Sequence, residues 1–328
     1  MSTVFERAKE ELTLRPCKHQ VAGHLFEEGK AGSLVDDAGH FYKPLQGGPR
    51  GRREREFYER IQGEVAAEAA ERLVSCANGT VGAAAGDAGV SGSRRKSWDG
   101  EPDRRQRAPF TARNAMLLRA IPTFLGVVEA GGRQLVALED VARHYRRPSI
   151  CDIKVGFRTW YPNGDAAYIQ RCQLKDAATT QSTLGFKICG MQVYRQCQRG
   201  YWRASKRWCK ELPPEGVNKA LLRFANNEAG LRPADIYGGV RGAIAQLRDL
   251  EAWFQEQREF YFYSSSVLLI YEGDVADAAD ARLSVRLVDF AHTFASDGKK
   301  DANFLAGLRA LIKALQGVVR MDFHDSLM

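Results

Sequence analysis

The sequence lacks any long apolar run. No stretch approaches the ~18 consecutive apolar residues that a membrane-spanning helix needs. Residues 1–7 contain acidic and basic side chains but no apolar segment of the kind found in signal peptides. We therefore expect neither a membrane span nor a cleaved leader.

The seven cysteines are an odd number and include no C-x-x-C pair. Their spacing argues against a structural zinc site and against a disulfide framework. Reduced thiols are typical of proteins in the cytosol or the nucleus. We therefore predict localisation in the nucleus and the cytoplasm.

Zinc-finger spacing, an RNA-recognition signature and heptad repeats are also missing. The net charge is nevertheless +8, from 48 Lys and Arg residues against 40 Asp and Glu residues. Such a charge suits nucleic acid, an anionic membrane or a polyanionic small molecule, although many basic side chains only aid solubility. Without a nucleic-acid motif we expect no specific nucleic-acid binding, and a polyphosphate ligand is the simplest explanation.

Neither common glycine-rich phosphate loop is present, because the chain has no G-x-x-x-x-G-K-[ST] and no G-x-G-x-x-G after a strand. A bound phosphate must then be held by side chains, a metal ion and ordinary backbone groups. The mixed order of strand-like and helix-like segments favours an α+β fold in two lobes over a doubly wound sheet. We assign residues 1–145 to an N-terminal lobe and residues 146–328 to a C-terminal lobe.

Local patterns predict several elements. Two strand-like runs, 124–128 and 134–138, flank the Gly131-Gly132 pair, which is typical of a tight hairpin. Residues 51–61 have helical periodicity. Further helices are expected at 64–73, 166–175, 215–225, from about 240 to 259, and at 303–315, and further strands at 184–194, 266–271 and 284–289.

Residues 76–107 are rich in Ala, Gly, Ser and charge. Such a segment buries too little apolar surface to offset its ordering entropy, so we predict a disordered insert. Its basic clusters at 94–96 and 104–107 resemble a bipartite nuclear localisation signal. A solvated charged linker has the same composition.

The most informative segment is residues 148–156, where Asp152 and Lys154 stand within an apolar, β-branched run. Residues i and i+2 of a strand point to the same face, so these two side chains are expected side by side. A carboxylate and an ammonium group held together suit phosphoryl transfer, where anionic oxygens need a cation. A structural ion pair has the same spacing, and the spacing alone does not decide between the two.

The P-x-x-x-D-x-K-x-G pattern of residues 148–156 resembles the signature of the inositol polyphosphate kinases. Four further segments also resemble that family, in the family's order: His19-Gln20-Val21-Ala22-Gly23-His24, Phe41-Tyr42-Lys43-Pro44-Leu45-Gln46, residues 265–272 and residues 287–292. Residues 158–162 and 168–172 are most similar to the plant and green-algal branch of the multikinases. The resemblance runs from about residue 19 to about residue 316, apart from the insert.

The resemblance implies a two-lobed, kinase-like α+β fold similar to phosphoribosyl-aminoimidazole-succinocarboxamide synthase, with ATP in the cleft between the lobes. It also implies an ATP- and Mg²⁺-dependent multikinase that phosphorylates inositol trisphosphate and tetrakisphosphate toward the pentakisphosphate. We expect a monomer. An inositol hexakisphosphate kinase that makes pyrophosphates is the enzyme alternative. A non-catalytic nuclear scaffold that retains the fold is the alternative of another class.

The family pattern assigns ATP contacts to five residues: Lys43, Glu139, Val141, Asp152 and Asp289. Asp289 is also expected to hold the metal ion. The hinge residues Glu139 and Val141 are expected to act through their backbones. Catalysis is assigned to Asp152, Lys154 and Asp289. Taken alone, a strand-end lysine such as Lys43 is usually solvated.

The resemblance assigns recognition of the inositol phosphate to Lys154, to a helical segment at about 157–185 that contains Arg171 and Lys175, and to three further residues: Lys206, Lys210 and His292. A lone histidine is more often a satisfied core residue. The chain departs from the pattern at Gln192, where several multikinases have arginine and hexakisphosphate kinases have glutamine. This departure leaves open which hydroxyls are phosphorylated.

Overall fold

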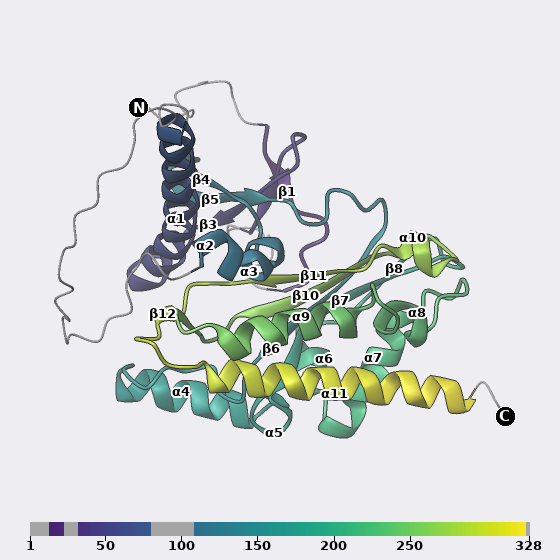
Figure 1. Ribbon diagram of the computed structural model, residues 1–328. Coiled ribbons are helices and arrows are strands. Elements are labelled where there is room, and N and C mark those ends of the chain that lie inside the picture. Colours follow the sequence, from purple (N-terminus) through teal and green to yellow (C-terminus); the bar gives the residue numbers. More distant parts are fainter. Residues whose placement is uncertain (1–12, 23–31, 80–107, 326–328) are drawn as a thin grey trace, which may run out of the picture.

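The structure is a computed structural model that describes residues 13–22, 32–79 and 108–325 (Figure 1). Its strands form two five-stranded sheets and one short ribbon, in which β9 (Phe260–Phe262) pairs with β12 (Thr293–Ala295). The predicted basic clusters of the insert, and His24 of the first motif, lie outside the described residues.

The N-terminal sheet has shorter strands and is called the smaller sheet. Its strand order is β1-β2-β3-β5-β4, and every pairing is antiparallel. Its strands are β1 (Arg15–Pro16), β2 (Leu34–Val35), β3 (His40–Pro44), β4 (Phe124–Ala130) and β5 (Arg133–Glu139). Gly131 and Gly132 join β4 to β5 with φ angles of 57° and 68°. These left-handed angles are those of the type I′ turn that a two-residue hairpin prefers, so the predicted hairpin is confirmed.

The larger sheet has the order β11-β10-β6-β7-β8 and is also antiparallel. Its strands are β6 (Pro148–Val155), β7 (Phe186–Arg195), β8 (Gly200–Arg203), β10 (Ser266–Glu272) and β11 (Ser284–Val288). The strand that carries Asp152 and Lys154 is therefore central, with a partner on each side. Its intervening residues, Ile153 and Val155, are fully buried on the opposite face.

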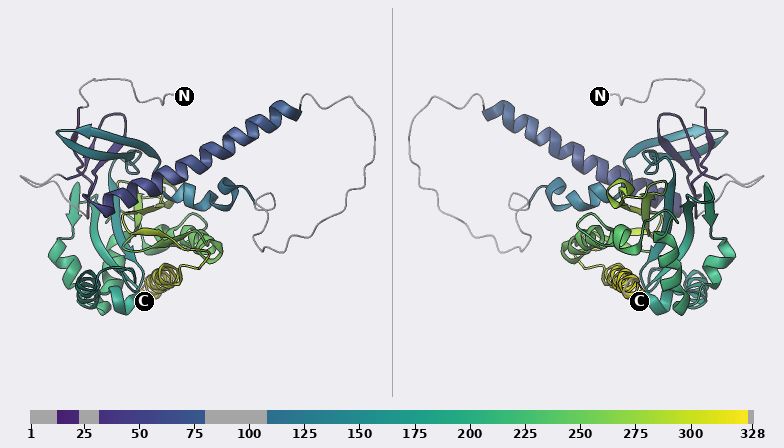
Figure 2. Two further views of the ribbon diagram at one scale, coloured as in Figure 1. Left: turned by 90° about the vertical axis from the view of Figure 1, so that its left-hand side faces the viewer. Right: turned by 90° about the vertical axis from the view of Figure 1, so that its right-hand side faces the viewer.

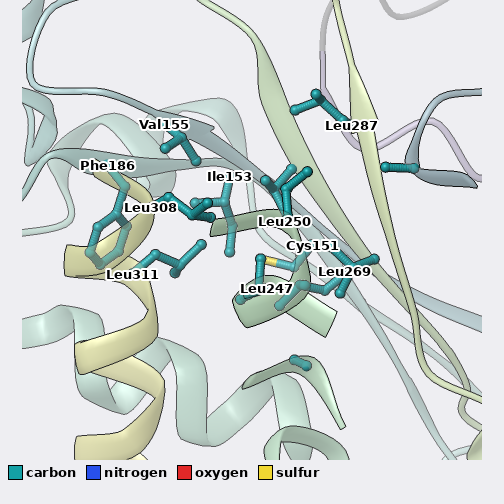
Figure 3. Close-up of a cluster of buried hydrophobic side chains, with 14 of the residues drawn as sticks. Cys151, Ile153, Val155, Phe186, Leu247, Leu250, Leu269, Leu287, Leu308 and Leu311 are labelled. Atoms are coloured by element: carbon teal, nitrogen blue, oxygen red, sulfur yellow. The ribbon is translucent and has the colours of Figure 1, made fainter. Parts of the chain in front are cut away.

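That opposite face is covered by helices (Figures 1 and 3). Cys151 and Ile153 of β6 share one apolar cluster with Leu250 of α9 (Ala243–Glu256) and Leu308 of α11 (Ala302–Asp325). Each fully buried side chain of this size contributes about 1.5–3 kcal/mol to folding. The packing fixes the pleat of β6, so that Asp152 and Lys154 point away from the core.

The remaining helices are short. They are α2 (Phe110–Arg113), α3 (Ala115–Ala120), α4 (Ala166–Ala177), α5 (Gln181–Leu184), α6 (Lys206–Glu211), the 3-10 turn η2 (Pro214–Gly216), α7 (Val217–Ala225), α8 (Pro233–Tyr237) and α10 (Ala278–Ala281). The predicted helices at 166–175 and 215–225 correspond to α4 and to η2 with α7. Helices α2 and α3 were not predicted from the sequence.

Helix α1 (Pro49–Gly79) is one continuous helix where two were predicted, and it extends away from both sheets (Figure 2). Its buried apolar residues Phe57, Tyr58 and Ile61 lie in the first half of the helix. The helix passes through Gly63 and ends at Gly79. The predicted insert boundary at 76 is therefore wrong by one helical turn, because the helix continues through residues 76–79.

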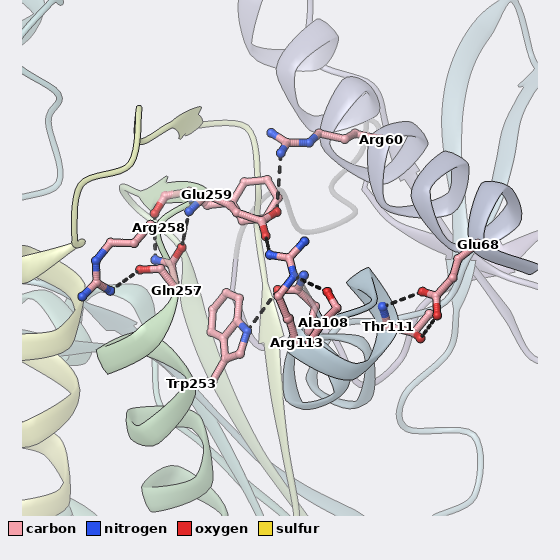
Figure 4. A network of polar contacts seen from close by, with 11 residues as sticks. Arg60, Glu68, Ala108, Thr111, Arg113, Trp253, Gln257, Arg258 and Glu259 are labelled. Carbon is pink, nitrogen blue, oxygen red and sulfur yellow. Dashed lines mark hydrogen bonds and ion pairs between the residues drawn. The ribbon is translucent and has the colours of Figure 1, made fainter. Parts of the chain in front are cut away.

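A polar network fastens α1 and α2 to the larger lobe (Figure 4). The carboxylate of Glu259 accepts from Arg60 of α1 at 3.5 Å and also binds Arg113 of α2. Glu68 accepts from the backbone N–H and the hydroxyl of Thr111 at 2.8 and 2.9 Å. These contacts fix the direction of α1, whose N-terminal half lines the cavity described below.

Helix α11 was predicted to end near residue 315 but continues to Asp325. By length and composition alone it is the one helix among the described residues that could cross a membrane. Its apolar stripe, including Phe304, Leu311 and Leu315, is buried. Because this stripe belongs to the main hydrophobic cluster, we interpret α11 as a core helix of the larger lobe.

The two sheets, with helices on the larger one, confirm the predicted α+β architecture in two lobes. The strands of the smaller sheet end at Glu139 and those of the larger sheet begin at Pro148. The boundary between residues 145 and 146 remains a prediction.

Candidate functional site

A cavity of about 370 Å³ lies between the two lobes. Its walls come from β3 and β5 of the smaller sheet, from β6 and β10 of the larger sheet, and from the start of α1. Seven residues assigned from the sequence line it: Lys43, Glu139, Val141, Asp152, Lys154, Asp289 and His292. Segments separated by up to about 250 positions thus meet in one place.

Lys43 is the link between the lobes. Its ammonium group, at the end of β3, lies 2.7 Å from an oxygen of Glu54 on α1 and 2.6 Å from an oxygen of Asp289. Burial opposes the charged form of Lys43, but the carboxylates of Asp289 and Glu54 outweigh it and raise the pKa of the lysine. The alternative interpretation, a solvated lysine at this strand end, is therefore wrong, and the predicted contact of Lys43 with ATP remains a prediction.

Glu54 was missed by the sequence analysis, although the sequence carries a signal for it. Glu54 precedes Phe57, Tyr58 and Ile61 by three, four and seven positions, which places all four on one face of α1. A carboxylate on an apolar helix face needs a cationic partner. Glu54 is only 1% exposed, and its Oε2 atom has no hydrogen-bond partner among the described residues.

Replacing Glu54 with glutamine is expected to lower the free energy of unfolding by about 1–3 kcal/mol, because a hydrogen bond to a charged group loses its ionic character. Lys43 keeps Asp289 as a partner, so the loss should be smaller than for a completely broken buried pair. Urea denaturation at pH 7 measures the change. The matched control is Glu56→Gln, an exposed position on the same helix. Equal stability of the two variants would contradict the role of Glu54.

Asp289 directly follows β11 and has a φ angle of 67°. Non-glycine residues rarely adopt this left-handed conformation, although aspartate tolerates it better than most. The Ser265 hydroxyl donates to the Asp289 carbonyl oxygen at 2.7 Å and supports the turn. Burial raises the pKa of Asp289, but Lys43 and Lys154 lower it more, so the carboxylate is ionised. The interpretation of Asp289 as a simple turn cap does not account for its ion pair with Lys43.

Asp152 is buried on β6, and its Oδ1 atom has no hydrogen-bond partner among the described residues. Burial, followed by the nearby negative charge of Asp289, raises the pKa of Asp152 to about 6. Two repelling carboxylates beside one cavity favour a cation or a hydrogen-bond donor between them. The described residues contain no group of three or more His, Cys, Asp and Glu side chains placed to hold a metal by themselves. A magnesium ion that also takes phosphate oxygens and water fits this sparse donor set.

Lys154 donates to the backbone carbonyl of Ser264 at 2.6 Å. No ion pair joins Lys154 to Asp152 in the described part of the chain. The interpretation of the two residues as a structural ion pair is therefore wrong. Both side chains line the cavity, and no direct ion pair between them keeps either from a ligand.

The end of β5 supplies a slot with apolar walls, formed with β3, β6 and β10 by Phe41, Leu138, Val141, Ile150, Leu268 and Ile270. The Glu139 carboxylate is engaged elsewhere, because it pairs with Arg286 at 2.8 Å and accepts from the Thr123 N–H at 3.1 Å. Its side chain is thus structural. The contact of the Glu139 backbone with a ligand remains a prediction.

His292 lies on the rim of the cavity, with ring centroids 5.8 Å from Tyr161 and 6.1 Å from Tyr168. Burial lowers its pKa to about 4, and the positive charges of Arg50 and Arg53 add to the effect. The imidazole is therefore neutral at pH 7. Its buried Nδ1 atom has no partner among the described residues, so His292 is not the satisfied core histidine that was the alternative.

Arg50, at the start of α1, also lines the cavity and was missed by the sequence analysis. Nothing in the run of arginines at residues 50–55 distinguishes it. Only the fold shows which of these side chains turns toward the other lobe.

Four assigned residues do not line the cavity: Arg171, Lys175, Lys206 and Lys210. The first two lie on α4 and the last two on α6, and all are exposed. The predicted helical spacing is confirmed for both pairs. Their contact with a ligand remains a prediction.

Gln192, the departure from the family pattern, is fully buried on β7. Its amide N–H donates to the carbonyl of Pro148 at 2.8 Å, and its amide oxygen accepts from Arg203 at 3.3 Å. His19 lies 3.1 Å from the same amide nitrogen. Gln192 is thus held by contacts within this chain, and its bearing on the choice of hydroxyl remains open.

Two antiparallel sheets with a charged cavity between them, bridged by a lysine paired with two carboxylates, define a two-lobed α+β fold of the kinase type. The family model described as inositol polyphosphate kinase matches residues 135–316. An inositol polyphosphate multikinase, the beta form from Arabidopsis thaliana, is 33% identical over 334 residues, which cover 95% of this chain and 96% of that protein. The chain belongs to the inositol polyphosphate kinase family.

Solved structures give the same result. A structure from work on the engineering of inositol phosphate multikinase is 34% identical, with a TM-score of 0.56, and the match covers 62% of this chain and 92% of that one. The multikinase of S. cerevisiae in complex with ADP and Mn²⁺ is 24% identical, with a TM-score of 0.50, over 63% of this chain and 94% of that one. The second likeness supports the fold alone.

Proposed function

We propose that this protein is an ATP-dependent inositol polyphosphate multikinase that phosphorylates inositol trisphosphate and tetrakisphosphate toward the pentakisphosphate. The observation that carries the proposal is the cavity in which Lys43 and Asp289 form an ion pair while Asp152 and Lys154 remain unpaired with each other. Membership of the family adds the substrate class. Catalysis of phosphoryl transfer needs mostly the positioning of the reactants and electrostatic stabilisation of the transferring phosphoryl group.

On this proposal, the adenine lies in the apolar slot against backbone groups of Glu139 and Val141. The ammonium group of Lys43 binds phosphate oxygens of ATP, and the free oxygen of Asp152 accepts from the ribose. Asp289 would hold Mg²⁺, which neutralises phosphate charge when bound. The yeast structure that shares the fold is a complex with ADP and Mn²⁺.

The acceptor is placed on the Lys154 side of the cavity, next to the neutral imidazole of His292 and the guanidinium of Arg50. Lys154 stabilises charge on the transferring phosphoryl group, and His292 orients the acceptor. Arg171 and Lys175 of α4, and Lys206 and Lys210 of α6, would bind phosphates already on the inositol ring.

We further propose a monomer that acts in the nucleus and the cytoplasm and binds no specific nucleic acid. Six cysteines lie in the described part of the chain, and all six are free thiols there, which supports a reducing compartment. Fractionation of cells that express a fluorescent fusion tests the localisation.

Incubation with ATP, Mg²⁺ and a panel of inositol phosphates tests the activity. We expect transfer to trisphosphate and tetrakisphosphate acceptors, with a pentakisphosphate as the end product. Chromatography of the product isomers identifies the hydroxyls used. Transfer to the hexakisphosphate alone would favour the pyrophosphate-forming alternative, and no transfer to any acceptor would favour the scaffold.

A further inference from the structure

Lys187 on β7 is a partly buried lysine to which the site above assigns no role. It lies directly opposite Lys154 in the antiparallel pair of β6 and β7. Opposite residues of such a pair project from the same face, so Lys187 shares the face that carries Lys154 toward the cavity. Its neighbours on β7, Phe186 and Ile188, point the other way, into the hydrophobic cluster.

No acidic side chain neutralises Lys187 within ion-pair distance in the described ranges. The nearby acidic groups are the thiol of Cys189, on the same strand, and the carboxylate of Asp176, at the end of α4, which is 3% exposed. Both oxygens of that carboxylate are already used, because one accepts from the Thr159 N–H at 2.9 Å and the other from the Thr159 hydroxyl at 2.8 Å. Asp176 thus holds the segment after β6 in place and leaves Lys187 unpaired.

Two further cations surround Lys187. Burial is the main cause that lowers its pKa, and the charges of Lys154 and Lys175 lower it further. The three lysines come from β6, β7 and α4 and lie near enough for their charges to affect Lys187, and among the described residues no acid forms an ion pair with any of them. Like charges held together are unfavourable unless an anion joins them, so the arrangement suits a ligand with several negative charges.

The strand order places this anion relative to the nucleotide. Across the larger sheet, Asp289 follows β11, Lys154 lies on β6 two strands away, and Lys187 lies on β7 beyond it. Lys43, which holds the proposed phosphates of ATP, pairs with Asp289. Lys187 therefore lies on the side of Lys154 that faces away from the nucleotide, where an acceptor carries its own phosphates.

We propose that Lys187 is a specificity residue that binds a phosphate group already present on the acceptor, in a subsite shared with Lys154 and Lys175. The proposal rests on the inositol phosphate kinase activity proposed above. The subsite would favour the binding of acceptors with a phosphate next to the reacting hydroxyl, because each such phosphate forms charge-assisted hydrogen bonds.

The test is Lys187→Met, which keeps the stem and removes the charge. We expect the KM for inositol trisphosphate to rise about 10- to 100-fold, because one hydrogen bond to a charged group is lost. The kcat and the KM for ATP should be nearly unchanged. Lys187→Arg should keep most of the affinity. The control is Lys219→Met, an exposed lysine on α7, for which no change is expected.

Thermal unfolding verifies that the variants fold, and Lys187→Gln replaces the methionine variant if that one does not. Calorimetry with inositol hexakisphosphate as the probe tests the subsite without turnover, and about tenfold weaker binding is expected. Unchanged acceptor KM and unchanged calorimetric affinity in a folded neutral variant would overturn the subsite. If the wild-type protein phosphorylates no inositol phosphate, the proposed function fails, and the calorimetric comparison still decides the role of Lys187.

Discussion

Asp289→Asn is expected to reduce kcat by about 1,000-fold or more, because a metal ligand that loses its charge forfeits several kcal/mol of transition-state stabilisation. Asparagine has nearly the same shape and also tolerates the φ angle of 67°. The asparagine side-chain oxygen can still accept from Lys43, and the contact of Lys43 with Glu54 at 2.7 Å is unaffected, so the fold should survive. Initial rates over a titration of Mg²⁺, at saturating ATP and trisphosphate, measure the effect.

Asp297→Asn is the matched control, because Asp297 is exposed and also has a positive φ angle, of 50°. It tests the same amide in the same backbone conformation outside the cavity, and we expect wild-type kcat. Near-normal turnover of Asp289→Asn at high Mg²⁺ would remove Asp289 from the metal site. A loss of folded protein in Asp289→Asn alone would mean that its charge serves stability instead.

The sequence predicted those parts of the fold that depend on short-range rules. The β4–β5 hairpin follows from Gly131-Gly132 between two apolar runs, and the alternation around Asp152 and Lys154 follows from the period of a strand. The length of α1 was not predictable in this way. A glycine at position 63 and an alanine-rich continuation suggest two helices, but the contacts of Glu68 with Thr111 hold the second half in line.

The site depends on contacts that no local rule gives. Lys43 and Asp289 are 246 positions apart, and only the resemblance to a family assigned both to the same ligand. Glu54 could have been predicted from helical periodicity, because it shares the apolar face of α1 with Phe57. The place of Lys187 could not have been predicted, because its register opposite Lys154 depends on the irregular step in the pairing between Asp152 and Ile153. A strand bulge of this kind changes which residues lie opposite each other and leaves no clear mark in the sequence.

Lys154→Ala is expected to lower kcat by about 100- to 1,000-fold with little change in the KM for ATP. Its ammonium group lies between the proposed nucleotide and acceptor positions, and a cation there stabilises charge that is greatest in the transition state. Its partner in the free protein is a backbone carbonyl, that of Ser264 at 2.6 Å, so no buried carboxylate is left unpaired when the lysine is removed. The fold should therefore be preserved.

Steady-state kinetics with ATP and trisphosphate varied separately measure this effect, and Lys313→Ala, an exposed position on α11, is the control. The contrast with Lys187 makes the pair of experiments informative. A cation that meets the transferring phosphoryl group affects kcat, whereas a cation that meets a phosphate already on the acceptor affects the acceptor KM. If Lys154→Ala changed only the KM for ATP, the lysine would belong to the nucleotide site. The acceptor would then have to bind elsewhere than beside β6 and β7.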